Sequence, residues 1–98
     1  MGNYKADEWD ADNAMAFLHE HGYNELRVKK RGALLTIESG PPDDPIKHAR
    51  LRRDTVHLWI LEIADHGGRF ESTGFRDQRN KLLEVLINDF PWVLTPIL

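Results

Sequence analysis

The longest apolar run in the chain is Thr55-Val56-His57-Leu58-Trp59-Ile60-Leu61-Glu62-Ile63-Ala64. Read with the two-residue period of a strand, it presents one apolar set on each face. The two sets are Val56, Leu58 and Ile60, and Trp59, Leu61 and Ile63. Because both faces are apolar, the run predicts a strand covered on both sides rather than a half-solvated edge strand. Its β-branched residues and tryptophan favour a strand over a buried helix.

The residues after this run predict a hairpin. Asp65-His66-Gly67-Gly68 supplies the turn, and residues 69–73 return as the partner strand. Tight turns between twisted strands require a positive φ, so either Gly67 or Gly68 is expected to have one.

The composition is that of one small soluble domain covering residues 1–98. Apolar residues make up 41% and charged residues 30% of the chain, which suffices for a single core. The absence of cysteine excludes disulfides and thiolate chemistry and fits a cytoplasmic location. The N-terminus does not have the pattern of a signal peptide, and no apolar run approaches the length of a membrane helix, so no membrane partner is expected.

The segments before the central run predict one helix and two or three strands. Residues 9–22 have helical apolar spacing, with Asp10 as the N-cap and Gly22 as the stop. Residues 25–30 and 33–39 alternate as strands around an Arg31-Gly32 turn. The proline-rich residues 40–45 end this hairpin, and residues 46–53 are expected to be extended.

The C-terminal part predicts a second helix and an apolar tail. The helix starts near Asp77, carries a wide apolar stripe and ends before Pro91. Residues 92–98 are too apolar for a frayed tail, so they are expected to dock as an edge strand or over an open face.

This order of elements predicts an α+β fold in a two-layer sandwich. An antiparallel meander of four to five strands carries the N-terminal and C-terminal helices on one face, in the order α-β-β-(β)-β-β-α plus a short C-terminal apolar tail. With both helices on the side of Leu26 and Val28, the face of Trp59, Leu61 and Ile63 is left without a cover. The tail or a second copy of the chain is therefore expected to cover it.

The formal net charge of -3 is unevenly distributed along the chain. Residues 1–25 carry one lysine against six acids, residues 26–53 carry eight basic residues against three acids, and residues 54–98 carry four against seven. The middle segment, from Arg27 to Arg53, is called the basic band below. Its Arg27 and Lys29 alternate onto the polar side of one strand, and Arg50 and Arg52 share a side if residues 46–53 are extended.

Catalytic and metal sites have little support in the sequence. His19 and His21 lack the i, i+4 spacing of a helical zinc pair, and the other three histidines belong to separate elements. Neither Ser39 nor Ser72 lies in a nucleophile-elbow pattern. Acids and His66 gather around the Asp65 turn, but Asp-His-Gly-Gly is more often only a turn. We therefore expect no enzyme activity, cofactor or metal, and the sequence identifies no small-molecule ligand.

Two binding functions remain. The first is a non-catalytic protein-interaction module that binds a protein partner, first of all its own copy as a homodimer. Its expected contact residues are Trp59, Leu61, Ile63, Trp92 and Leu94. The alternative is a nucleic-acid-binding module that uses the basic band through Arg27, Lys29, Arg50 and Arg52, with Trp59 as a stacking aromatic. An isoelectric point of about 5.9 argues against a dedicated nucleic-acid binder.

Overall fold

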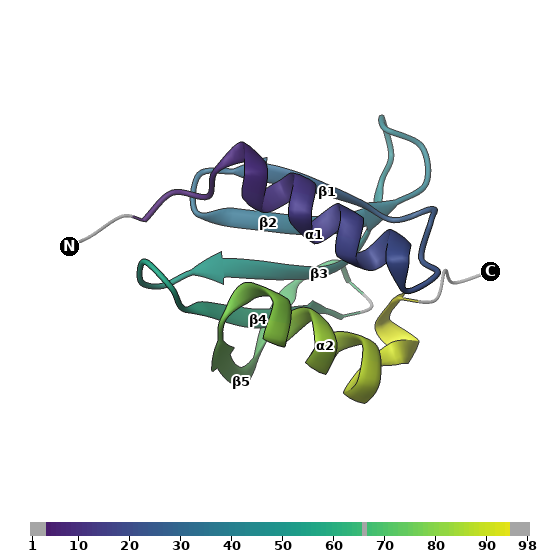
Figure 1. The fold of residues 1–98 in the computed structure, drawn as a ribbon. Coiled ribbons are helices and arrows are strands. Elements are labelled where there is room, and N and C mark those ends of the chain that lie inside the picture. The colour runs from purple at the N-terminus through teal and green to yellow at the C-terminus, as the bar shows by residue number, and fades with distance from the viewer. Residues whose placement is uncertain (1–3, 66, 95–98) are drawn as a thin grey trace.

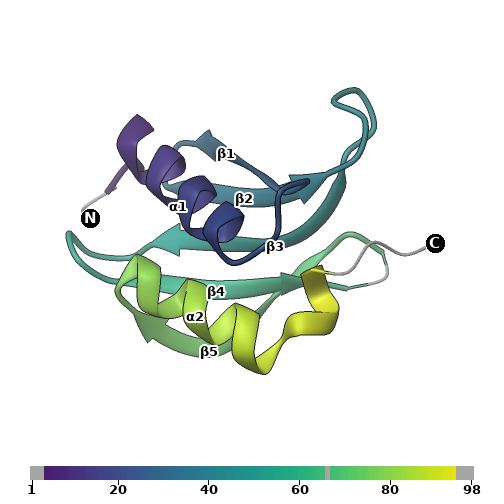
Figure 2. The ribbon, with the colours of Figure 1, turned by 45° about the vertical axis from the view of Figure 1, so that its right-hand side comes forward.

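Five antiparallel strands form one sheet in their chain order, β1-β2-β3-β4-β5. The computed structural model describes residues 4–65 and 67–94. The strands are β1 (Arg27–Arg31), β2 (Leu34–Ser39), β3 (Ile46–Arg53), β4 (Trp59–Ala64) and β5 (Phe70–Asp77). The helices are α1 (Glu8–Glu20), α2 (Arg79–Asp89) and the short 3-10 helix η1 (Pro91–Leu94). Figures 1 and 2 show α1 and α2 on the same face of the sheet, which confirms the predicted two-layer α+β sandwich.

Helix α1 begins earlier than predicted because Asp7, and not Asp10, is its N-cap residue. Asp10 lies one turn in, where its carboxylate accepts a hydrogen bond of 3.0 Å from the Asp7 N–H. Acidic side chains are favourable at both positions, so composition alone does not separate them. Gly22, with φ +92°, follows the helix and ends it as predicted.

The strands around the basic band largely follow the prediction. Strand β3 spans Ile46–Arg53, the whole segment expected to be extended. The β1–β2 turn lies at Gly32 and Ala33, one residue later than expected, and Gly32 has φ +59°. The pairing of β2 with β3 shifts register between Ile37 and Glu38, a bulge that the sequence did not indicate.

The central run is shorter as a strand than predicted. Strand β4 starts at Trp59, and the residues before it form the turn after β3, where the N–H groups of Asp54 and Thr55 donate to the Leu58 carbonyl. Val56 is accordingly 49% exposed. The turn after β4 is as predicted: the Asp65 N–H donates to the Arg69 carbonyl, and Gly68 has φ +77°.

The face of Trp59, Leu61 and Ile63 is the face that the helices cover, so the expectation that it lacks a cover is wrong. Register places Ile63 in one row with Val28, through Ile37 and Ala49. Trp59 and Leu61 belong to the buried core with Leu18 of α1 and with Leu82, Leu83 and Leu86 of α2. The opposite face, with Ile60 and Glu62, has no covering element within the described residues, so β4 is covered on one side only.

The C-terminal segment does not form an edge strand in its described part. Residues Pro91–Leu94 form η1, in which Leu94 is buried in the core and Trp92 is 65% exposed. Residues 95–98 of the predicted tail lie outside the described residues, as does His66. Among the described residues, neither helix has the length and apolar character needed to cross a membrane.

Candidate functional site

The open face of the sheet carries most of the basic band. Strand pairing places its side chains in two rows that cross all five strands. The rows are Lys29–Thr36–Arg50–Glu62–Ser72 and Arg31–Leu34–Arg52–Ile60–Arg76. Arg27 lies beside the first row, opposite Glu38. Arg27, Lys29, Arg50 and Arg52, which the sequence singled out, therefore share one surface, here called the basic face.

Two buried glutamates organise the arginines of the basic face. Glu62, 4% exposed, accepts from Arg50 Nε at 2.6 Å and also from Arg52. The Arg50 guanidinium stacks over the Phe70 ring, 4.2 Å from its centroid. Glu38 lies 3.7 Å from an Arg27 nitrogen. Because Glu62 occupies only part of Arg50 and Arg52, their remaining guanidinium N–H groups stay available to a ligand. Arg27 differs, since it donates to the Gly40 carbonyl and its Nε and Nη2 are buried.

The acidic helix α1 lies on the other side of the sheet from the basic face. Its exposed acids, which include Glu8, Asp12 and Glu20, are separated from the arginine rows by the sheet itself (Figure 2). The chain is therefore acidic overall but polarised, with positive charge gathered on one face.

The residues predicted for protein contact do not form one surface. Trp59 and Leu61 are 3% and 0% exposed in the core, and Leu94 is buried as well. Trp59 therefore lies on the face opposite the basic rows and does not serve them as a stacking platform. Trp92 alone of the predicted set is a large exposed side chain, and it contacts Phe90 at 5.5 Å between ring centroids.

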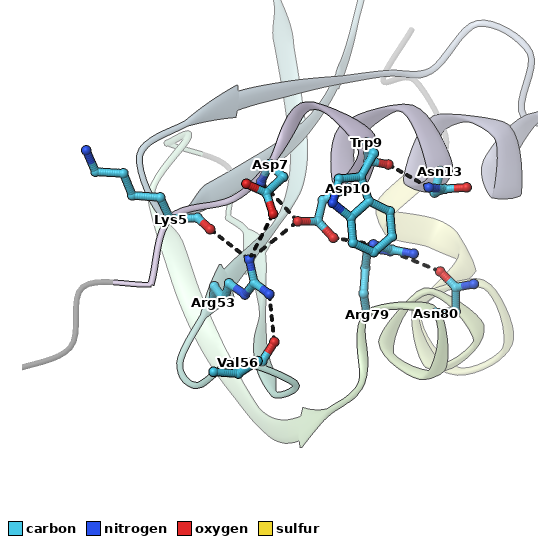
Figure 3. A network of polar contacts seen from close by, with 9 residues as sticks. All are labelled: Lys5, Asp7, Trp9, Asp10, Asn13, Arg53, Val56, Arg79 and Asn80. Carbon is cyan, nitrogen blue, oxygen red and sulfur yellow. Dashed lines mark hydrogen bonds and ion pairs between the residues drawn. The ribbon is translucent and has the colours of Figure 1, made fainter.

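A polar cluster that the sequence did not indicate joins the starts of α1 and α2 to the end of β3 (Figure 3). The buried Asp10 carboxylate accepts a hydrogen bond from Arg79 and lies 3.6 Å from Arg53 Nη1. Arg53 also donates to the backbone carbonyls of Lys5 and Val56. Arg79 was the sequence feature that could have indicated this cluster. A cation in the first turn of a helix opposes the helix dipole, so a nearby acid is expected to pair with it.

A second unpredicted cluster pairs Ser39 with His48. Ser39 Oγ lies 2.7 Å from His48 Nε2, and His48 Nδ1 lies 2.8 Å from the Val93 carbonyl oxygen. Since a carbonyl only accepts, Nδ1 carries a proton, and in the neutral ring Nε2 accepts from the Ser39 hydroxyl. Ser39 and His48 are 4% and 3% exposed, so this pair is enclosed and ties η1 to the sheet rather than facing a substrate.

Within residues 4–65 and 67–94, no group of three or more acids and histidines is placed to hold a metal ion. Comparison with known protein families, with curated proteins and with solved structures gives no match for this chain.

Proposed function

We propose that this chain is a non-catalytic cytoplasmic module that binds single-stranded nucleic acid on its basic face. One observation carries the proposal: the two cross-strand rows place Lys29 and Arg50, and Arg31, Arg52 and Arg76, on one open surface. An open sheet with basic side chains is a platform on which an extended phosphate backbone can lie.

The distribution of acids supports this reading. Acids of the N-terminal segment would repel phosphates if they lay beside the arginine rows, but α1 packs on the opposite face. Among the described residues, three acids contact the basic residues of this face: Glu38 and Glu62 are buried beneath arginines, and Asp54 pairs with Arg76 at 2.6 Å at the β5 end of the second row. A phosphate that approaches this face meets the lysine and arginine side chains before the buried glutamates. Their attraction for the phosphate acts over about a Debye length at physiological salt.

The expected recognition is by phosphate and not by base sequence. The aromatic side chain on this face, Phe70, is covered by Arg50, so it is not free to stack on a base. Arg50 and Arg52 are held by Glu62 and keep further N–H donors for phosphate oxygens. Binding should therefore tolerate any sequence and weaken steeply with salt.

The experiment compares two neighbouring lysines of β1. Lys29 belongs to the basic face, whereas Lys30 pairs with Leu35 on the helix side. Neither makes an ion pair within the described part of the chain, so Lys29→Glu and Lys30→Glu change the net charge equally without breaking an ion pair. Lys29→Glu should weaken retention on single-stranded RNA and lower the slope of log affinity against log salt by about 0.7 for each phosphate that is no longer neutralised. Lys30→Glu should retain the wild-type slope.

Two results would contradict the proposal. One is equal weakening by the two lysine variants, which would indicate an effect of net charge alone. The other is a wild-type protein that shows no retention at low salt.

A second candidate function, self-association, is supported by an exposed aromatic patch. The patch consists of Phe75, Phe90 and Trp92, with Phe75 edge-to-face on Phe90 at 6.0 Å and Trp92 65% exposed. It lies beside β5, an edge strand that a second copy could extend. Two basic faces would repel each other, so this patch is the better place for a contact between copies.

Light scattering tests the second candidate. A homodimer should give twice the monomer mass of 11.4 kDa at high concentration, and Trp92→Ala should return it to the monomer. Trp9→Ala removes another exposed tryptophan, in the first turn of α1, and should leave the dimer intact. A wild-type mass of 11.4 kDa at high concentration would exclude self-association.

A further inference from the structure

A cleft opens where the starts of α1 and α2 meet the turn between β3 and β4. Its volume is about 480 Å³, within the range of roughly 300–1,000 Å³ that small-molecule sites occupy. The lining residues that bear on its chemistry are Trp9, Asp10, Arg53, His57, Arg79 and Asn80. Figure 3 shows most of this polar lining, with Trp9 above the guanidinium of Arg79.

The charges of the cleft favour an anion. Among the lining residues, Arg53 and Arg79 face the single buried carboxylate of Asp10; the exposed Asp7 carboxylate, outside the lining, lies 3.7 Å from Arg53 Nη1, so Arg79 is the cation left for an anion. Asp10 is fully engaged, because it also accepts from the Asp7 N–H. Arg53 Nε is buried and has no acceptor among the described residues.

The start of α2 adds further donors at the same place. Its N-cap, Gln78, makes no side-chain cap hydrogen bond, and its first turn contains no acid. The free N–H groups of a first helical turn are therefore not met by a side chain of the helix itself. Helix α1, in contrast, has Glu8 and Asp10 in its first turn.

An exposed aromatic ring stands at the rim. Trp9 is 56% exposed, and the Arg79 guanidinium lies 5.0 Å from its ring centroid. Exposed indole surface beside an anion site suits a ligand in which a planar ring is joined to the anion. The side-chain amides of Gln78 and Asn80 on the cleft wall offer hydrogen bonds to the polar edge of such a ring.

We propose that this cleft binds a nucleotide. The phosphate lies against Arg79, Arg53 and the first turn of α2, and the base stacks on the face of Trp9 that Arg79 leaves free, with its edge toward the amides. The site is separate from the basic face and does not depend on it.

The protein is titrated with adenosine monophosphate and, separately, with inorganic phosphate. Binding is measured by calorimetry and by the NMR chemical shifts of the backbone amides of Arg79, Asn80 and Lys81. Both probes should shift these amides. Trp9→Ala should weaken nucleotide binding about tenfold or more, the usual effect of removing a stacking side chain, and leave phosphate binding unchanged. Trp92→Ala, which removes another exposed tryptophan elsewhere, should change neither.

Arg79→Lys keeps the charge but removes the guanidinium fork, so it should weaken both probes. Because Arg79 is hydrogen-bonded to buried Asp10, a melting curve checks that Arg79→Lys is folded. If Arg79→Lys is unfolded, Trp9→Ala provides the decisive result. Lys29→Glu should leave nucleotide affinity unchanged, which separates this site from the basic face. The proposal is overturned if neither probe binds saturably, if phosphate binds as tightly as the nucleotide, or if the two tryptophan variants behave alike.

Discussion

Arg79, in the first turn of α2, donates a hydrogen bond to Asp10, in the first turn of α1, across a sequence separation of 69 residues. Arg53 at the end of β3 approaches the same carboxylate at 3.6 Å. One buried acid thus joins both helices to the sheet. The contact also places two guanidiniums at the cleft proposed to bind a nucleotide.

Asp10→Asn should destabilise the fold strongly, because it leaves the largely buried Arg79 without its carboxylate and Arg53 with only the exposed Asp7. Breaking a buried ion pair from one side costs about 3–5 kcal/mol, and for a domain of this size the melting temperature should fall by more than about 10 °C. Asp12→Asn removes the same charge from the exposed side of α1 and should have little effect. Urea unfolding of the two variants is the measurement, and equal midpoints would show that the Asp10 contact contributes nothing.

Glu62→Gln should lower stability and at the same time strengthen polyanion binding. The change leaves Arg50 and Arg52 without their carboxylate and should lower the free energy of unfolding by about 1–3 kcal/mol. The loss should lie toward the lower end of this range, because Arg52 is half exposed and screened by water. The basic face gains one positive charge, so elution from heparin should move to higher salt. Glu71→Gln is the matched control, since Glu71 pairs with Ile63 on the helix side. Identical elution of both variants would contradict a role for the basic face.

His48→Ala should loosen the C-terminal turn. It removes the partners of Ser39 Oγ and of the Val93 carbonyl inside the protein, which should cost about 1–3 kcal/mol. Hydrogen exchange should rise at the Val93 N–H, which donates to Phe90 within this turn. His57→Ala, at an exposed position, should change neither quantity. Unchanged exchange at Val93 in His48→Ala would show that the turn is held by Leu94 packing alone.

Gly68→Val should cost about 1–3 kcal/mol, because a β-branched residue is strained at φ +77°. An added Cβ at Gly68 meets no atom within 4 Å, so the cost is that of the backbone conformation alone. Gly67→Val is the neighbouring control; its Cβ would lie 3.5 Å from Asp65 Oδ1, an ordinary contact, and its φ is not positive. Thermal unfolding should therefore separate the two variants, and equal melting temperatures would place the strain elsewhere.

The patterns that the sequence resolved are the local ones. Alternation along β1 and β2, the glycines at the turns and the leucine stripe of α2 each depend on neighbours within a few residues, and they predicted the α+β sandwich correctly. The expectation that Arg27 and Lys29 lie on one surface with Arg50 and Arg52 also followed from strand alternation. The start of α1 was misplaced because two acids three residues apart both suit a helix N-terminus.

By itself, then, the sequence determined the order of the five strands and two α-helices and which side chains alternate within each strand, but not the start of β4 or the conformation of residues 91–94. Only the tertiary structure decided which face of one hairpin continues into which face of the next. That depends on the register of β3 against β2 and β4, and a shift of one residue reverses every side chain. The register put Ile63 on the side of Val28, buried Trp59 beneath the helices, and left the arginines outside. The meeting of Asp10, Arg53 and Arg79 likewise required the packed helices, because no local pattern relates residues so far apart in the chain.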